Sequence, residues 1–160
     1  MANSVLHAGD RAPAFTLPSD DGSRLRLTEH RGRWVVLYFY PKDFTPGCTT
    51  QACDFQEVLG DFEDAGAMVV GISPDSVESH AEFRDHCGIE FPLLHDRDAK
   101  IASRYGVWRE KRHRGRSYLG IVRSTLLLDP SGRVVQVWDN VRVRGHADKV
   151  LTWLRRELER

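Results

Sequence analysis

The sequence has little of several features that mark particular classes of protein. It has only three cysteines in 160 residues, too few for the disulfide framework of a small secreted domain. Lys+Arg and Asp+Glu each number 23, and this zero formal net charge argues against a dedicated nucleic-acid-binding protein. No run of about 18 apolar residues occurs, so no membrane-spanning helix is expected. The sequence also contains no internal repeat and no low-complexity linker.

Length, composition and the N-terminal segment predict a single intracellular domain. A chain of 160 residues that is 41% hydrophobic and 29% charged is typical of one globular domain, expected here over residues 1–160. The start, from Met1 to His7, lacks a basic segment followed by an apolar one. A secretory signal is therefore not expected, and the cytoplasm is the default location. In that reducing compartment, a disulfide is more typical of catalysis than of structural support.

Hydrophobic patterning predicts an α/β domain built on a central sheet. Strands 34–40 and 67–73 are apolar throughout, and the segment between them has a helical pattern from Cys48 to about Ala65. A helix that links two strands makes them parallel neighbours with a right-handed crossover. A hairpin around Asp129–Gly132, joining strands 124–128 and 134–138, is expected to extend the fold.

The remaining segments are expected to flank this sheet. An N-terminal β-hairpin is predicted over residues 11–28, where apolar alternation surrounds an Asp-Gly turn. Further predicted elements are helices at about 76–87, 97–105 and 146–158 and a short strand at 91–94. Residues 107–120 are polar and rich in arginine, so we expect a loop there.

The most informative segment is Pro41–Cys48, which joins an apolar strand to a helix. Thr45 is predicted as the N-cap and Pro46 as the first helical residue, because both types are preferred there. Cys48 then lies in the first turn, where free N–H groups and the positive end of the helix dipole favour a thiolate. The thiolate is the nucleophilic form of cysteine. A buried, inert cysteine at an ordinary helix start is the alternative interpretation.

Several ordered motifs resemble those of peroxiredoxins, in the AhpC/TSA family. The pattern Pro41-x-x-x-Thr45-x-x-Cys48 matches the active-site pattern of peroxiredoxins, and the run from Tyr40 to Thr50 resembles the bacterioferritin comigratory protein, or Q-type, branch. The resemblance extends over nearly the whole chain, through the motifs Gly71–Ser76, Phe91–Leu94, Tyr105–Trp108 and Arg123–Thr125. It implies a thioredoxin-like fold, with a central mixed sheet flanked by helices. It also implies a peroxidase without metal or organic cofactor.

The resemblance implies a role for each residue of the motif. Cys48 is then the peroxidatic cysteine, which attacks the O–O bond of hydrogen peroxide or an organic hydroperoxide and becomes a sulfenic acid. Thr45 hydrogen-bonds the peroxide, Pro41 shields the site, and Arg123 stabilises the thiolate and polarises the peroxide. Arg123 also directly precedes strand 124–128, at an end of the sheet. Without the motif, a surface arginine is the simpler interpretation of that residue.

The second and third cysteines raise the question of how the sulfenic acid is resolved. In the branch that the chain resembles, a cysteine in the position of Cys53 forms an intramolecular disulfide with the peroxidatic cysteine. Five helical residues rise about 7.5 Å and turn about 140°, whereas a disulfide needs Cα atoms within about 7 Å. We therefore expect the first turns of the helix to unwind when Cys48 and Cys53 join. A buried structural thiol is the alternative for Cys53. Cys87 is expected to be a buried core thiol, with a resolving role left open.

Other chemistries are less well supported by residue spacing. Cys48 and Cys53 lack the spacing of a zinc knuckle, and His80 and His86 do not share a helix face, so no metal site is expected. The cysteine spacing also differs from the C-x-x-C of disulfide reductases. The basic stretch 109–116 is interpreted as a solvated, mobile loop rather than a nucleic-acid site.

Partners and an alternative function follow from the same resemblance. Electrons are expected from thioredoxin or a similar dithiol protein, and the chain is expected to be a monomer or a weak homodimer. The alternative is a redox sensor or holdase, which uses oxidation of Cys48 to change shape without fast turnover.

Overall fold

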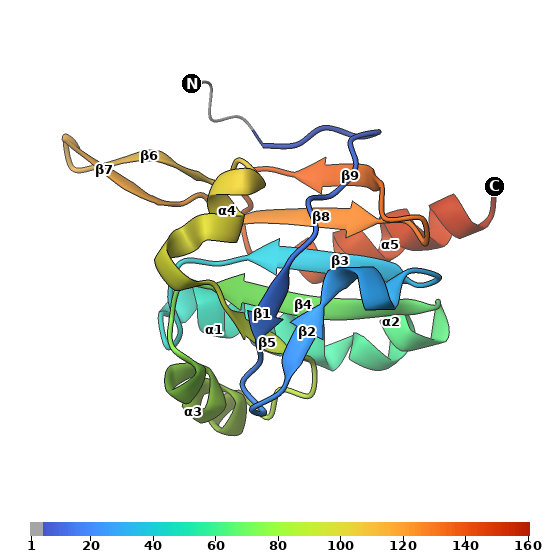
Figure 1. Ribbon diagram of the computed structural model, residues 1–160, viewed down its shortest axis with the longest axis horizontal. Helices are drawn as coiled ribbons and strands as arrows, with labels where there is room; N and C mark the ends of the chain where they lie inside the picture. Colours follow the sequence, from blue (N-terminus) through green and yellow to red (C-terminus); the bar gives the residue numbers. More distant parts are fainter. Residues whose placement is uncertain (1–4) are drawn as a thin grey trace.

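A five-stranded mixed sheet forms the centre of the molecule (Figure 1). The computed structural model describes residues 5–160, so the first part of the N-terminal segment considered for a leader lies outside the described residues. The strand order is β5-β4-β3-β8-β9, with β3 at Trp34–Phe39, β4 at Ala67–Ser73, β5 at Leu93–His95, β8 at Ser124–Leu128 and β9 at Val134–Trp138. β3 pairs with β4 in parallel and with β8 antiparallel. The predicted mixed sheet and parallel pair are confirmed.

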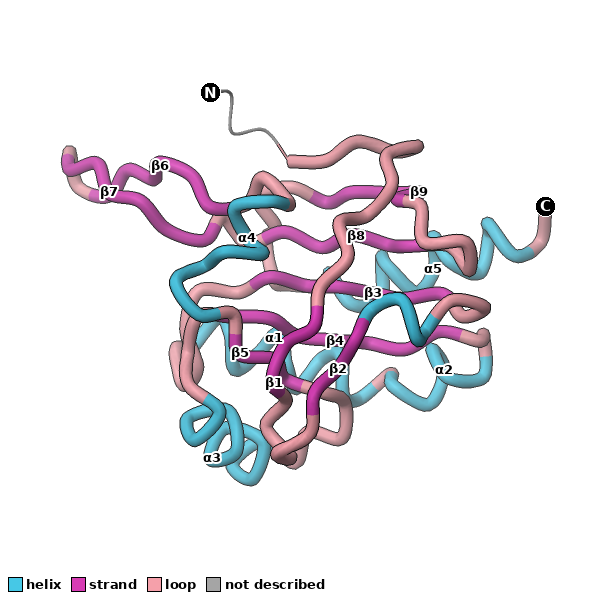
Figure 2. Tube along the Cα trace, viewed as in Figure 1, coloured by secondary structure: helices cyan, strands magenta, loops and turns pink. Residues whose placement is uncertain are grey.

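Helices and short elements cover the two faces of this sheet (Figure 2). On one face, a buried cluster combines residues of β3 and β4 with α1 (Pro46–Glu57), α2 (Leu59–Asp64), α3 (Val77–Cys87) and α5 (His146–Leu158). On the other, a second cluster includes the hairpin β1 (Thr16–Pro18) and β2 (Arg24–Arg26), the 3-10 turns Leu27–His30 and Arg97–Ala99, and α4 (Lys100–Arg104). The period of two in a strand sends alternate residues to opposite faces. Val36 and Tyr38 accordingly join the first cluster, and Leu37 joins the second.

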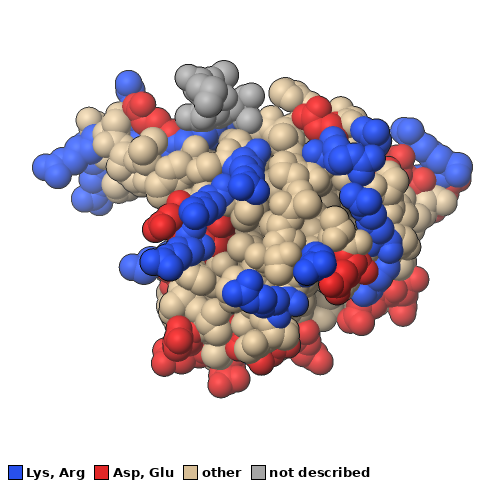
Figure 3. All heavy atoms as spheres, in the orientation of Figure 1, with Lys and Arg blue, Asp and Glu red and all other residues tan. Residues whose placement is uncertain are grey.

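The segment predicted as a loop over residues 107–120 is instead a β-hairpin. β6 (Trp108–His113) pairs antiparallel with β7 (Arg116–Ile121). At the turn, Arg114 and Gly115 both have positive φ, 52° and 78°, as the favoured two-residue hairpin turns with two left-handed residues require. The hairpin projects from the body of the molecule, and Lys and Arg side chains gather at its end (Figures 1 and 3). Most of its residues are exposed, so the apolar alternation by which a half-buried strand is recognised is missing.

Two predicted helices are interrupted in the structure. The segment from Cys48 to about Ala65 divides into α1 and α2 at Val58, whose backbone (φ −107°, ψ 13°) is not helical. The predicted helix 97–105 begins as a 3-10 turn and then breaks, because Asp98 and Ala99 both have positive φ. By contrast, α3 begins and ends as predicted: Ser76 caps its first turn by accepting from the Ser79 amide, and Gly88 ends it with φ 65°. None of the helices within residues 5–160 is long and apolar enough to cross a membrane.

Gly71, at the centre of β4, provides a test of how tightly the sheet packs. A Cβ atom there would lie 2.9 Å from the side chains of both Tyr38 and Leu93, so we expect Gly71→Ala to lower the free energy of unfolding by about 1–3 kcal/mol. Gly60, in α2, is the matched control, since a Cβ atom there meets nothing within 4 Å. Gly60→Ala is expected to stabilise by about 0.4–1 kcal/mol. Urea unfolding under reducing conditions measures both, and equal stability of Gly71→Ala and wild type would contradict the packing argument.

Candidate active site

Cys48 lies in the first turn of α1, directly after the loop that leaves β3. Thr45 is the N-cap, with extended backbone dihedral angles, and Pro46 is the first helical residue. The loop therefore delivers the cysteine to the end of the helix where the backbone N–H groups have no partner within the helix. Cys48 is 1% exposed, so only a small molecule or a local opening of the structure can reach its sulfur.

Arg123 contacts the sulfur of Cys48. Its Nη2 donates a hydrogen bond to Cys48 Sγ at 3.3 Å, and its Nη1 donates to Gln51 Oε1 at 2.6 Å. Arg123 immediately precedes β8, which pairs with β3, so the sheet places it beside the start of α1. A fixed cation that donates a hydrogen bond to sulfur stabilises the thiolate.

Two neighbours place the guanidinium of Arg123: Gln51 accepts a hydrogen bond from it, and Gly47 leaves room for it. Gln51 is buried, and it lies one turn after Cys48 on the same side of α1. Gly47 makes room, because a Cβ atom there would lie 3.2 Å from Arg123 Nη2. Sequence reasoning missed Gln51, although its spacing of three residues from Cys48 was a usable signal.

The other two predicted site residues, Thr45 and Pro41, lie in the loop between β3 and α1. The Thr45 hydroxyl does not cap the helix; it donates instead to the backbone carbonyl of Lys42 at 2.8 Å. This bond occupies the hydroxyl hydrogen and leaves the oxygen lone pairs available as acceptors. Pro41 is half-buried. The loop therefore presents an acceptor near the start of the helix that carries Cys48.

A buried polar network attaches this loop to α3, and sequence reasoning missed it. The Asp43 carboxylate accepts from Tyr40 Oη at 2.6 Å and from Ser79 Oγ at 2.8 Å, and it lies 2.7 Å from His80 Nδ1. His80 Nε2 lies 3.0 Å from the carbonyl of Leu94. Both ring nitrogens of His80 therefore have an oxygen atom within hydrogen-bond distance. Because the Asp43 and His80 side chains are 1% and 0% exposed, breaking this pair is expected to be costly.

An aromatic contact attaches the same loop to α3 a second time. Phe44 has a positive φ of 66°, which is strained for a bulky residue. Its ring lies against those of Phe83 and His86, with centroid separations of 5.2 and 5.6 Å. The network and this contact together tie the loop before Cys48 to α3.

The β6–β7 hairpin contributes a further cation near the site. Lys111 Nζ donates to the carbonyl of Ile121 at 2.7 Å and lies over the ring of Tyr118. Burial, and then the charge of Arg123, lower the pKa of Lys111, while the charge of Cys48 opposes them. Lys111, in the middle of β6, thus lies within the electrostatic reach of Cys48. Because a loop is expected over 107–120, the sequence does not predict that Lys111 lies near Cys48.

The other two cysteines are both more exposed than a buried thiol in the core. Cys53 is exposed on α1, which rules out a buried structural thiol, and Cys87 is only partly buried, so the expected core thiol is a wrong prediction. The end of a helix leaves a side chain less covered than its middle, which explains the error for Cys87. All three cysteines are free. Within residues 5–160, no group of three or more His, Cys, Asp or Glu side chains is arranged to hold a metal ion.

Comparison with known proteins identifies the family. A model of the AhpC/TSA family matches residues 8–137. Peroxiredoxin Bcp of Xanthomonas campestris is 48% identical over 157 residues, which are 97% of this chain and 97% of that protein. The chain belongs to the AhpC/TSA family.

Solved structures give the branch and confirm the fold. Peroxiredoxin Q of Xylella fastidiosa, crystallised as a cysteine-to-serine variant, is similar with a TM-score of 0.92 and 38% identity, over 97% of this chain and 99% of its own. Xanthomonas campestris bacterioferritin comigratory protein, studied for its alkyl peroxide reduction activity, has a TM-score of 0.88 and 44% identity, over 94% of this chain and 99% of its own. The fold is thioredoxin-like, and the chain is a peroxiredoxin of the Q-type branch, a thiol-dependent peroxidase.

The two hydrogen bonds of Arg123 can be tested by substitution. Arg123→Lys keeps the charge but loses the fixed fork that reaches both Cys48 and Gln51. We expect the rate constant of peroxide reaction to fall by about tenfold in this variant and by about 100-fold in Arg123→Gln, since a hydrogen bond to a charged group is worth about 1.5–3 kcal/mol. Stopped-flow fluorescence measures the rate. The exposed Arg116→Gln variant is the control, and a wild-type rate in Arg123→Gln would leave the arginine a structural role only.

Proposed function

We propose that Cys48 is the peroxidatic cysteine of a thiol-dependent peroxidase that reduces hydrogen peroxide and organic hydroperoxides. The observation that carries this proposal is the hydrogen bond from Arg123 Nη2 to Cys48 Sγ at 3.3 Å, in the first turn of α1. The thiolate attacks one peroxide oxygen, the O–O bond breaks, and Cys48 becomes a sulfenic acid. The other oxygen leaves with a proton as water or alcohol. The sulfur itself supplies the two electrons.

The roles proposed for the remaining site residues follow from their hydrogen bonds. Arg123 stabilises the thiolate and then the negative charge that develops on the departing oxygen. The Thr45 hydroxyl, whose hydrogen is directed to Lys42, accepts a hydrogen bond from the peroxide and orients it. Pro41 shields the sulfur from bulk water. Because the sulfur of Cys48 is buried, small peroxides are the substrates that reach it most readily.

Cys53 is proposed as the cysteine that resolves the sulfenic acid. Its thiol attacks Cys48 Sγ, a disulfide forms, and the sulfenic hydroxyl leaves as water. Both cysteines lie within α1, where a spacing of five residues places them on different sides of the helix. The disulfide therefore requires the first turns of α1 to unwind, which also brings the buried sulfur of Cys48 towards Cys53.

The proposed cellular setting rests on the family. We propose thioredoxin or a similar dithiol protein as the reductant, because a disulfide on an unwound and exposed segment is open to thiolate attack. Alkyl peroxides are among the proposed substrates, on the precedent of the Xanthomonas campestris relative. A cytoplasmic location, a single domain over residues 1–160 and a monomer or weak homodimer complete the proposal.

Turnover in a coupled assay tests the two cysteine roles. We expect Cys48→Ser to lose peroxide consumption entirely. Cys53→Ser is expected to reach the sulfenic acid once and then to stop with thioredoxin as the reductant, because no disulfide is available for it to reduce. The assay follows hydrogen peroxide with thioredoxin, its reductase and NADPH. Slow or single turnover by the wild-type chain would favour the sensor or holdase over the peroxidase.

Unwinding of α1 is tested by hydrogen exchange. The Cys87→Ser variant leaves only Cys48 and Cys53 to pair, so its oxidised form has one disulfide. We expect amides within 46–56 to exchange at least tenfold faster in the oxidised than in the reduced form, since helical hydrogen bonds protect them. The amides of α5 serve as the internal control. Equal protection over 46–56 in the two forms would contradict the requirement for unwinding.

A further inference from the structure

Cys53 and Cys87 lie side by side, although they belong to different helices. Cys53 is in the middle of α1 and Cys87 is the last residue of α3. The Cys53 side chain is near enough to Cys87 to contribute to the rise in the pKa of Cys87. Each is at least partly exposed, and both are free. Helices α1 and α3 pack against each other, so a disulfide between these two thiols joins segments that are already neighbours.

A neighbouring pair of hydrogen bonds holds the two helices in this register. Gln56 Nε2 donates to Glu90 Oε1 at 2.7 Å, and the Glu90 amide donates to Gln56 Oε1 at 2.8 Å. Gln56 follows Cys53 by three residues, so both lie on the same side of α1. That side of α1 therefore packs against the end of α3 and the residues that follow it. Because Gln56 lies beyond Cys53, this attachment does not depend on the turn that contains Cys48.

We propose that Cys87 is the third member of a thiol relay, in which the Cys48–Cys53 disulfide is exchanged for a Cys53–Cys87 disulfide. This inference rests on the proposed Cys48–Cys53 disulfide. The Cys87 thiol loses its proton to solvent, and its sulfur attacks Cys53 Sγ. The Cys48–Cys53 bond breaks, and its electron pair leaves on Cys48 as a thiolate. One disulfide replaces another, so no further oxidant or reductant is needed.

Two features of the structure favour the direction of this exchange. A Cys48–Cys53 bond is incompatible with an intact α1, whereas a Cys53–Cys87 bond joins neighbouring residues of α1 and α3 and leaves α1 folded. The exchange therefore allows the first turns of α1 to re-form. The departing sulfur of Cys48 also regains its hydrogen bond from Arg123, and a stabilised thiolate is the better leaving group.

The environment of Cys87 suits a relay rather than a direct reaction with peroxide. Burial first, and then the adjacent Cys53 sulfur, raise the pKa of Cys87 to about 11. Its thiol is therefore protonated at neutral pH and does not compete with Cys48 for peroxide. The part of the shift that comes from Cys53 disappears once Cys53 is in a disulfide, which moves the pKa of Cys87 back towards its ordinary value.

The exchange moves the disulfide away from the reactive sulfur of Cys48. Cys48 is returned to the reduced form in a folded site, while Cys53 and Cys87 hold the oxidising equivalent at the surface between α1 and α3. A dithiol reductant then has an accessible disulfide to attack without unfolding of the active site. Without any reductant, the chain reduces two molecules of peroxide: one leaves the Cys53–Cys87 disulfide, and the second leaves a sulfenic acid on Cys48.

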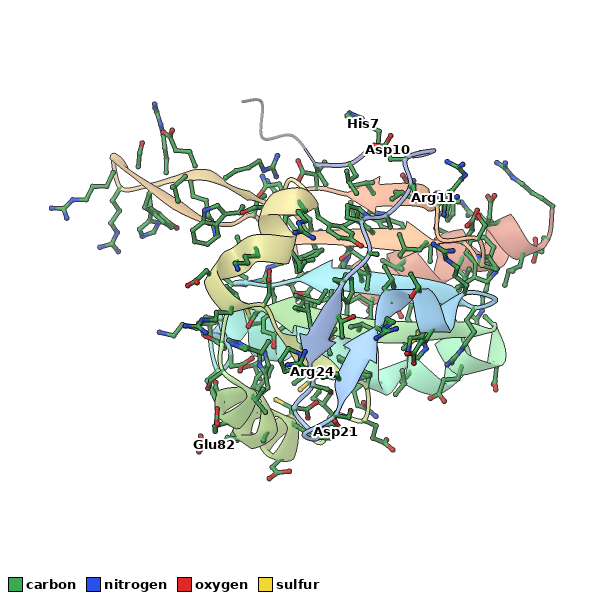
Figure 4. All side chains as sticks on the ribbon, in the orientation of Figure 1. His7, Asp10, Arg11, Asp21, Arg24 and Glu82 are labelled. Atoms are coloured by element: carbon green, nitrogen blue, oxygen red, sulfur yellow. The ribbon has the colours of Figure 1, made fainter. Side chains whose placement is uncertain are left out.

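The stoichiometry of peroxide consumption tests the relay. Reduced wild-type chain, freed of reductant, is given two equivalents of hydrogen peroxide with dimedone present to trap sulfenic acid, and its disulfides are mapped by mass spectrometry. We expect two equivalents to be consumed, with a Cys53–Cys87 disulfide and a dimedone adduct on Cys48. Cys87→Ser and Cys87→Ala are expected to consume one equivalent and to keep the Cys48–Cys53 disulfide. Glu82→Gln, on the outward side of α3 (Figure 4), is the matched control and is expected to behave as wild type.

The outcomes separate this inference from the function on which it rests. If wild type consumes one equivalent and keeps the Cys48–Cys53 disulfide, as Cys87→Ser does, the relay is wrong and the proposed resolution stands. If no Cys48–Cys53 disulfide forms in Cys87→Ser, the proposed resolving role of Cys53 fails and the relay fails with it. A Cys53–Cys87 disulfide that follows a transient Cys48–Cys53 disulfide in quenched time points supports both.

Discussion

The hydrogen bond between Arg123 and Cys48 is the contact on which the rest of this structure converges. It requires α1 to begin at Pro46, so that the sulfur lies in the first turn. It requires β8 to pair with β3, so that the residue before β8 lies beside that turn. Gly47 leaves room for the guanidinium, and Gln51 holds its other nitrogen. A shift in any of these elements separates a fixed cation from the sulfur that it stabilises.

The same helix that creates this contact stands in the way of the next chemical step. A helix that holds Cys48 against Arg123 also holds it apart from Cys53. The reaction therefore needs a segment that is stable enough to form the site and weak enough to open. The attachments of α1 are distributed accordingly: the loop before it is tied to α3 through Asp43 and Phe44, and its later part is tied through Gln56 and Glu90. The turn between these attachments is the part left free to unwind.

Much of the fold followed from local pattern, and the errors have physical causes. Apolar runs in β3 and β4, the Ser76 cap and the Gly88 end of α3 are short-range signals, and the structure has these elements where they were expected. The β6–β7 hairpin was missed because it projects into solvent and buries too little to show alternation. The break at Val58 was missed because apolar periodicity continues through it. The prediction of a core position for Cys87 is wrong because the sequence does not indicate which helix end is covered.

Local signals in the sequence place a cysteine where a strand ends and a helix begins, because strand, cap and helix signals all act within a few residues. Its motifs also determined the family. What meets that cysteine depends on the tertiary fold, since Arg123 is 75 positions away along the chain. The fold likewise brings Cys53 near Cys87 and pairs Asp43 with His80 in the interior. Contacts between distant segments arise from sheet order and helix packing, and no local pattern encodes them.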